Sequence, residues 1–408
     1  MDPSTTNVFN TINPQVHRLK RRLVSQLLTP TSIRSLEPII TEQIDLFVKQ
    51  LSTTSTTKTG AESAVNMSRR CKYLGLDIAA LLAFGYNLRL QTEEEHRYLP
   101  RAIARGSWII NLYMQLRFLK TIKFGIPIYV PAIIKGEAFL PTLRKMIKAR
   151  LAEDRYARVD LYSHLADALQ ASGDEKITLS ELWAEAIFFL PAAGDTSSTA
   201  LSSLFFYLAR NPECQKTVAK EIRSTFTAGD DIKSGQKLAN CQYLHACINE
   251  ALRLSPPVAG TVWREQSLES AKELLIIDGR VIPQGTQVGV NIYSIHHNPD
   301  YFPEPFAYKP ERWLPSSSTE SSEKASNTAA FMPFGAGSRA CAGKPLAYLE
   351  VGMALAKTLW YFDFDFAQSV DTSGSNHDTE FRLKDVFTSD HDGPFLQFTP
   401  RGDFYKEL

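Results

Sequence analysis

The 408-residue sequence lacks several features that mark common classes of protein. No run approaches the ~18 apolar residues of a membrane span, and no signal peptide opens the chain. Its 45 basic and 44 acidic residues leave a net charge of +1, so no global field favours nucleic acid. The five cysteines are widely spaced, without a C-x-x-C or His/Cys cluster. This spacing gives no indication of zinc and favours a reducing, intracellular compartment.

One cysteine nevertheless lies in a distinctive setting. Residues 334–343 read Phe-x-x-Gly-x-Arg-x-Cys-x-Gly, with Cys341 as the cysteine. Five fixed positions at average residue usage coincide by chance in fewer than roughly one chain in a thousand of this length. Glycines at 335, 337 and 343 permit positive φ angles and a close backbone approach to a ligand. A helix is expected to follow, and its N-terminal dipole would favour a thiolate. For Cys341 taken alone, a buried structural cysteine is the better interpretation.

The stretch resembles the haem-thiolate loop of the cytochrome P450 family. The resemblance implies that Cys341 is the axial ligand of a haem b iron and that Arg339 binds a haem propionate. Phe334, Gly337 and Gly343 would complete the cofactor-binding loop. It also implies one mainly α domain with small β-sheets over residues 1–408. Related fungal and animal proteins usually begin with an anchor in the endoplasmic reticulum membrane. We therefore expect a P450 fold that is N-terminally incomplete, without that anchor and the first strands.

A second motif, Ala-Ala-Gly-Asp-Thr-Ser at 192–197, lies within a predicted long helix. Several of these residues are poor helix formers, which indicates either a flat neighbour or a local opening of the helix. The motif resembles the oxygen-binding groove of the same family, with Ala193 where glycine is usual. Thr196 would then hydrogen-bond bound dioxygen, and Asp195 would relay protons so that the O–O bond breaks heterolytically. The alternative is a helix-interior pair that bonds only backbone groups.

Further basic and acidic residues match the family pattern in chain order. His17 and Arg21 lie four residues apart on one helix face, and Arg264 follows a proline bend; the resemblance makes all three propionate partners. The pair Glu250 and Arg253 stands in a Glu-x-x-Arg pattern, which by itself occurs by chance about once in a chain this long. The resemblance implies that this pair and Arg312 form a buried ion network beneath the haem. These three residues are assigned to the scaffold.

The hydrophobic periodicity predicts a helix-rich chain. Helices are expected near 17–28 and at 32–51, 66–88, 98–151 with an interruption at 125–131, 160–171, 182–210, 212–226, 241–254 and 346–362. A hairpin is expected at 274–282, a strand at 287–290 and a further hairpin in the tail. Residues 52–62 and 316–327 are expected to be polar loops.

The resemblance implies a haem-dependent monooxygenase that inserts one atom of dioxygen into an apolar small molecule, in a pocket above the haem. Electrons would come from NADPH through NADPH-cytochrome P450 reductase, and the basic residues at 18–22 suit an acidic partner surface. The motifs resemble those of fungal secondary metabolism. Two alternatives stay open: a haem-binding but catalytically impaired fragment, and a haem-thiolate isomerase or dehydratase that needs no reductase.

Overall fold

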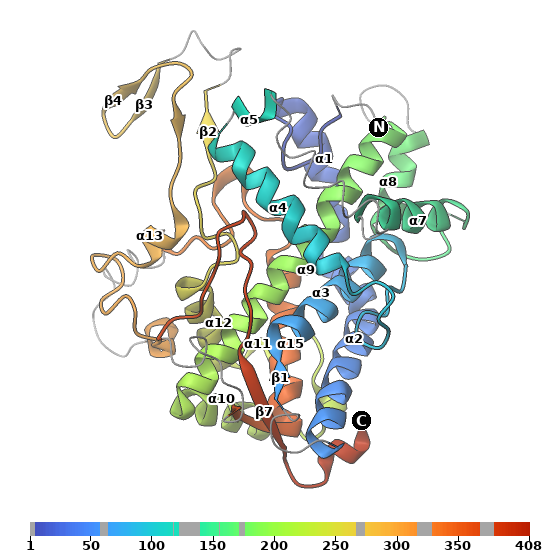
Figure 1. Ribbon diagram of the computed structural model, residues 1–408, viewed down its shortest axis with the longest axis vertical. Helices are drawn as coiled ribbons and strands as arrows, with labels where there is room; N and C mark the ends of the chain where they lie inside the picture. Colours follow the sequence, from blue (N-terminus) through green and yellow to red (C-terminus); the bar gives the residue numbers. More distant parts are fainter. Residues whose placement is uncertain are drawn as a thin grey trace.

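The computed structural model describes residues 5–57, 64–116, 118–121, 139–154, 156–170, 176–266, 274–315, 329–367 and 379–408. A long helix, α9, runs through the middle of the molecule, and the other helices surround it (Figure 1). The helices are α1 (Pro14–Leu27), α2 (Pro30–Thr57), α3 (Met67–Phe84), α4 (Leu99–Gln115), α5 (Phe118–Thr121), α7 (Phe139–Leu151), α8 (Leu161–Gln170), α9 (Leu179–Arg210), α10 (Pro212–Thr225), α11 (Gln236–Ala239), α12 (Gln242–Leu254), α13 (Ile292–His296) and α15 (Lys344–Tyr361).

The β-structure among the described residues is small and antiparallel. One sheet has the order β1-β7-β6, a second pairs β2 with β5, and a third is the β3–β4 hairpin. The strands are β1 (Val65–Asn66), β2 (Arg264–Glu265), β3 (Leu275–Ile277), β4 (Arg280–Ile282), β5 (Gln287–Val288), β6 (Phe362–Phe366) and β7 (Phe395–Pro400). The predicted mainly α fold with small sheets is confirmed.

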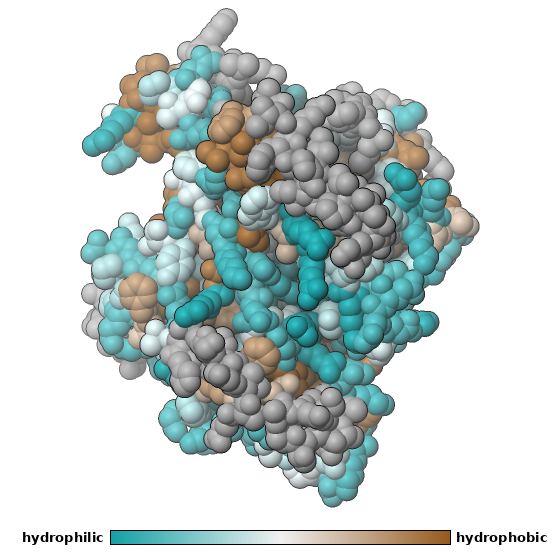
Figure 2. Space-filling view, viewed as in Figure 1, coloured by the Kyte–Doolittle hydropathy of each residue, from teal (hydrophilic) through white to brown (hydrophobic). Residues whose placement is uncertain are grey.

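The β3–β4 hairpin stands away from the helices (Figure 1). Its turn places Asp278 and Gly279 at positive φ, +48° and +71°, as a two-residue hairpin turn requires. Apolar side chains gather on this hairpin in the surface view (Figure 2), among them the exposed Leu274, Ile276 and Val281. No helix among the described residues combines the length and apolarity that a membrane crossing requires.

Local sequence explains where α9 begins and how closely it is packed. Thr178 and Glu181 form a reciprocal capping box at its start, so the helix begins at Leu179 and not at the predicted residue 182. In its middle, α3 crosses so closely that a Cβ on Gly75 would lie 2.3 Å from the Gly194 carbonyl oxygen. Gly75 is thus required by the contact with α9, while a Cβ on Gly194 would lie 3.0 Å from the Gly75 carbonyl oxygen. This contact fixes the part of α9 that carries Asp195 and Thr196.

Several predicted boundaries differ from the structure. Helix α2 runs through Pro38 and on to Thr57, so the loop predicted from residue 52 begins too early; Ser and Thr cost a helix only a few tenths of a kcal/mol each. Helix α3 ends at Phe84, because Gly85 adopts the left-handed conformation that closes the helix. Helix α15 begins at Lys344 and passes directly into β6. The interruption at 125–131 and the loop at 316–327 lie outside the described residues.

Candidate functional site

The cysteine loop forms a tight turn immediately before α15. The backbone N–H of Cys341 donates to the carbonyl oxygen of Phe334 at 2.8 Å, closing the loop. Gly335 and Gly337 have φ values of +68° and +70°, as predicted. The prediction for Gly343 is wrong: its φ is −79°, in the range any residue adopts. An added Cβ would lie 3.7 Å from the Cys341 sulfur, an ordinary van der Waals contact, so packing against the sulfur does not require glycine either.

Cys341 presents an exposed thiol from this turn. Desolvation by surrounding atoms raises its pKa, although the residue keeps contact with solvent. Backbone N–H groups of Gly343 and Lys344, at the start of α15, and the charge of Arg21 lower it. Two amides and a helix N-terminus directed at the sulfur favour the thiolate that a metal ligand must be.

Four basic residues from three distant parts of the chain, here called the basic cluster, converge beside this loop: His17, Arg21, Arg264 and Arg339. Arg21 on α1 donates a hydrogen bond to the carbonyl oxygen of Ala340, next to the cysteine. Burial lowers the pKa of His17, and the charges of Arg339 and Arg21 lower it further. Burial also lowers the pKa of Arg339, with the charge of Arg264 adding to the effect.

Among the described residues, none of the basic cluster forms an ion pair with a carboxylate. Each close charge within the cluster has the same sign, which is unfavourable unless an anion is present. A group with two carboxylates would balance these charges, while the thiol of Cys341 supplies a ligand for a metal. On this chemistry, the residues fit a haem with its propionates toward the basic cluster and its iron toward Cys341.

The residues predicted on the oxygen side lie on two faces of α9. Ala192 and Thr196, four residues apart, are partly exposed, whereas Asp195 is buried on the α3 side. The hydroxyl of Thr196 donates to the Ala192 carbonyl oxygen at 2.6 Å, which is the backbone bond foreseen as the alternative. No local opening is present, because α9 is continuous from Leu179 to Arg210.

Asp195 has an unusual electrostatic environment. Burial raises its pKa to about 7, while Lys72 lowers it and Asp390 raises it. No hydrogen bond to its carboxyl oxygens comes from the part of the chain that the structure describes. A carboxyl group that changes charge near neutral pH is suited to proton transfer.

Glu250, Arg253 and Arg312 form the predicted ion network, and Glu250 and Arg253 are fully buried. Arg253 contacts both carboxylate oxygens of Glu250, at 3.0 and 2.9 Å, and Arg312 Nε lies 3.0 Å from Glu250 Oε1. Arg253 also donates to the carbonyl oxygens of His296 and Pro305, at 2.8 and 2.7 Å. The positive charges are thus matched by a carboxylate and by carbonyl oxygens, which makes their burial tolerable.

Two members of this region were not identified from the sequence. Trp313 donates its indole N–H to Glu250 at 2.9 Å. His296, buried, bonds the Arg253 carbonyl oxygen through Nδ1 at 3.1 Å and accepts the Met332 N–H at Nε2 at 3.0 Å. The two hydrogen-bond partners of His296 lie 36 and 43 residues away in the sequence. Local residue spacing therefore does not predict these bonds.

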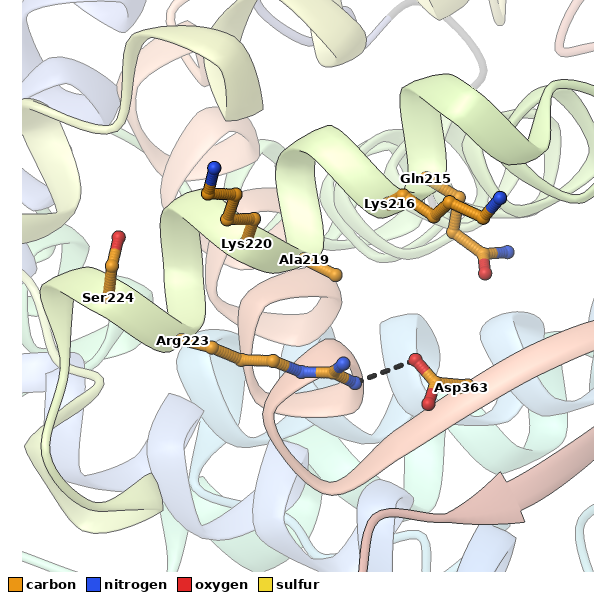
Figure 3. Close-up of a pocket in the computed structure, with 7 residues that line it drawn as sticks. All are labelled: Gln215, Lys216, Ala219, Lys220, Arg223, Ser224 and Asp363. Atoms are coloured by element: carbon orange, nitrogen blue, oxygen red, sulfur yellow. Dashed lines mark hydrogen bonds and ion pairs between the residues drawn. The ribbon is translucent and has the colours of Figure 1, made fainter.

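A surface groove between α10 and β6 is separate from all these residues (Figure 3). Two of its basic residues are already paired: Arg223 contacts Asp363 at 2.8 Å, and Lys216 contacts Glu213 at 2.8 Å. None of the predicted site residues lines it. No group of three His, Cys, Asp or Glu side chains able to hold a metal occurs within the described ranges.

Comparisons with known proteins show which family and which relatives the sequence is similar to. A family model described as Cytochrome P450 matches residues 1–386. The chain is 33% identical over 419 aligned residues to the cytochrome P450 monooxygenase apf7 of Gibberella fujikuroi, covering 98% of this chain and 78% of the relative. It is 34% identical over 337 residues to lcsN of Purpureocillium lilacinum, covering 82% and 99%. It is 31% identical over 408 residues to atnE of Emericella nidulans, covering 97% and 77%. Both of these relatives are also named cytochrome P450 monooxygenases.

Proposed function

The chain belongs to the cytochrome P450 family and is a haem-dependent monooxygenase, and we propose that it oxidises an apolar small molecule of fungal secondary metabolism. The observation that carries the proposal is the basic cluster beside Cys341. Three arginines and a histidine, drawn from α1, β2 and the cysteine loop, have no carboxylate partner among the described residues. In this proposal residues 1–408 form a single haem-thiolate domain, and haem b is the group that completes it.

When bound, haem supplies the activation of dioxygen, with a thiolate that donates electron density to favour O–O cleavage. Cys341 is the proposed ligand, and the N–H groups of Gly343 and Lys344 stabilise its charge. Arg21, Arg264, Arg339 and His17 are the proposed propionate partners.

On the other side of the haem, Thr196 and Asp195 are proposed to handle protons. Thr196 would exchange its 2.6 Å bond to the Ala192 carbonyl for one to the oxygen species in the pocket. Burial raises the pKa of Asp195 to about 7, so its carboxyl group can take up and release a proton near neutral pH, although it lies on another face of α9 than Thr196. Partly exposed Phe188 and Ala192 continue the Thr196 face of α9 at intervals of four residues and would line the substrate side.

The proposed electron source is NADPH acting through NADPH-cytochrome P450 reductase. Arg18 is exposed and Arg22 partly exposed on α1, the helix that also carries Arg21. A basic surface at this position would attract an acidic partner and raise the association rate at low salt. The proposed reductase therefore has an acidic surface where it contacts α1.

The proposal is tested in two steps on the haem-loaded protein. The reduced carbon monoxide complex should show the red-shifted thiolate band, and Cys341→Ala should abolish it. Absence of haem uptake by the wild-type chain would overturn the proposal. NADPH- and reductase-dependent oxidation of an apolar substrate panel is the second step; turnover without reductase would point to an isomerase or dehydratase.

The proposed role of Thr196 has a matched control. Thr196→Ala should release more peroxide per NADPH consumed, because protons reach the oxygen more slowly. Thr217 on α10 makes the same bond, from its hydroxyl to the carbonyl four residues earlier at 2.8 Å, but is exposed and lies outside the site. Thr217→Ala should match the wild type. Equal peroxide release from all three proteins would refute the role of Thr196.

A further inference from the structure

The proposed function leaves one aromatic contact beside the cysteine loop without a role. The ring of Phe334, at the start of the loop, lies 5.5 Å from the ring of Tyr348 on α15, measured between centroids, with 35° between the ring planes. The carbonyl oxygen of Phe334 also accepts the N–H of Cys341 at 2.8 Å. The hydrogen bond that closes the loop is therefore made by the residue that Tyr348 contacts.

Tyr348 is joined to α12 at two points. Its hydroxyl donates a hydrogen bond to Asn249 Oδ1 at 2.5 Å, and its ring centroid lies 6.2 Å from that of His245. His245 and Asn249 are four residues apart on α12 and share one face of that helix. Asn249 immediately precedes Glu250 of the ion network. Tyr348 thus connects the cysteine loop with the helix that carries the ion network.

The protonation state of Tyr348 makes this connection insensitive to pH near neutrality. Burial raises the pKa of Tyr348 from its ordinary value of about 10 to about 12. The phenol consequently keeps its proton and remains a donor to Asn249. A partly buried tyrosine whose hydroxyl has a partner combines an apolar contact surface with a fixed orientation.

A second residue of α15 also contacts the Phe334 ring, but it is less firmly held. Lys344 lies one turn before Tyr348, and its ammonium nitrogen is 5.8 Å from the ring centroid of Phe334. The Lys344 side chain is exposed, whereas Tyr348 is partly buried and bonded to Asn249. Tyr348 is therefore the better support for the position of the Phe334 ring.

The beginning of the cysteine loop is tied to α12 by a separate route. The N–H of Met332 donates to His296 Nε2 at 3.0 Å, and the other ring nitrogen of His296 bonds the carbonyl oxygen of Arg253 at 3.1 Å. This route ends at Met332, two residues before Phe334. The Tyr348 contact continues the attachment to the residue that bonds Cys341.

We propose that Tyr348 is a positioning residue that holds Phe334 against α12 and thereby keeps the loop closed at Cys341. This rests on the proposed function, in which Cys341 is the iron ligand. An aromatic pair of this kind should favour the closed loop over the open one by a factor of about two to ten. Without Tyr348, the N–H of Cys341 would leave the Phe334 carbonyl oxygen more often, and the sulfur would lose its fixed position.

The test measures hydrogen–deuterium exchange at the amide of Cys341 in the full chain purified with haem. Tyr348→Leu removes the ring and the hydroxyl and should speed this exchange about two- to tenfold. Tyr348→Phe keeps the ring contact but loses the bond to Asn249, so its increase should be smaller. Phe404→Leu is the control, because it removes an aromatic contact of 5.9 Å with Trp360 near the other end of α15. It should leave exchange at Cys341 unchanged.

The second readout is the red-shifted band of the reduced carbon monoxide complex. Its half-life in mild urea should shorten in Tyr348→Leu and stay at the wild-type value in Phe404→Leu, because loss of the thiolate ligand follows opening of the loop. This readout separates a role at the loop from a general loss of stability, which both variants of α15 contacts would share.

Exchange at the wild-type rate in both Tyr348 variants would overturn the proposal, as would equal acceleration in Phe404→Leu and Tyr348→Leu. Tyr348→Phe removes a single oxygen atom, so it decides the matter even where Tyr348→Leu does not fold. A wild-type chain without the red-shifted band would refute the proposed role of Cys341. Amide exchange, in contrast, tests the support of the loop by Tyr348 whether or not the sulfur binds iron.

Discussion

Two groups of charged residues in this protein differ in one respect, the presence of a counter-charge. In the ion network, Glu250 accepts hydrogen bonds from Arg253, Arg312 and Trp313 at 2.9–3.0 Å. In the basic cluster, positive groups lie beside one another, and no carboxylate pairs with them in the part of the chain that the structure describes. A balanced set of charges is complete within the fold. An unbalanced set indicates a ligand of opposite charge.

Breaking the ion network should give the largest effect on stability. Arg253→Met leaves the buried carboxylate of Glu250 without its main partner, and loss of one member of such a pair costs roughly 3–5 kcal/mol. Urea unfolding of the haem-free chain, followed by circular dichroism, measures this loss. Lys216→Met, which breaks an exposed pair with Glu213, is the control and should cost far less. Equal costs for the two variants would remove the distinction between the ion network and an ordinary surface pair.

The histidine bonded to the ion network should make stability depend on pH. Burial lowers the pKa of His296 to about 3, below the unfolded value of about 6.5. Between these values the unfolded chain binds more protons than the folded one, so stability is lost as the pH falls from 6.5 toward 3. His296→Gln should flatten this dependence by about 1.4 kcal/mol per pH unit.

Urea unfolding at several pH values within this window checks the prediction. His391, whose pKa burial also lowers to about 3, provides an internal comparison. His391→Gln should remove a second contribution of the same sign, and the double variant should remove both. An unchanged slope in His296→Gln would mean that the imidazole takes up a proton in the folded chain.

The contrast between the two groups also explains what the sequence reveals and what it hides. The Phe-x-x-Gly-x-Arg-x-Cys-x-Gly spacing singled out Cys341, and the family resemblance supplied the three residues of the ion network, which the Glu-x-x-Arg spacing alone could not. Trp313 and His296 were missed, since their partners are backbone and side-chain atoms distant in sequence. Gly75 carries no motif, yet a Cβ at this position would lie 2.3 Å from the Gly194 carbonyl oxygen of α9. Such requirements depend on which helices cross, and a single sequence does not state that.

Substitutions in the basic cluster should have the smallest effect on stability. The sign of this effect distinguishes the basic cluster from the ion network. Arg339→Met removes a desolvated charge that lies near Arg264 and His17, so the haem-free chain should lose no stability or gain up to about 1 kcal/mol. The same variant should release haem faster to a haem-scavenging protein, because a propionate loses its partner. Arg18→Met on the exposed face of α1 is the control and should change neither quantity. If Arg339→Met leaves the stability of the haem-free chain unchanged but speeds haem release, Arg339 contributes through its contact with haem. A loss of stability comparable to that of Arg253→Met would instead place Arg339 in the scaffold.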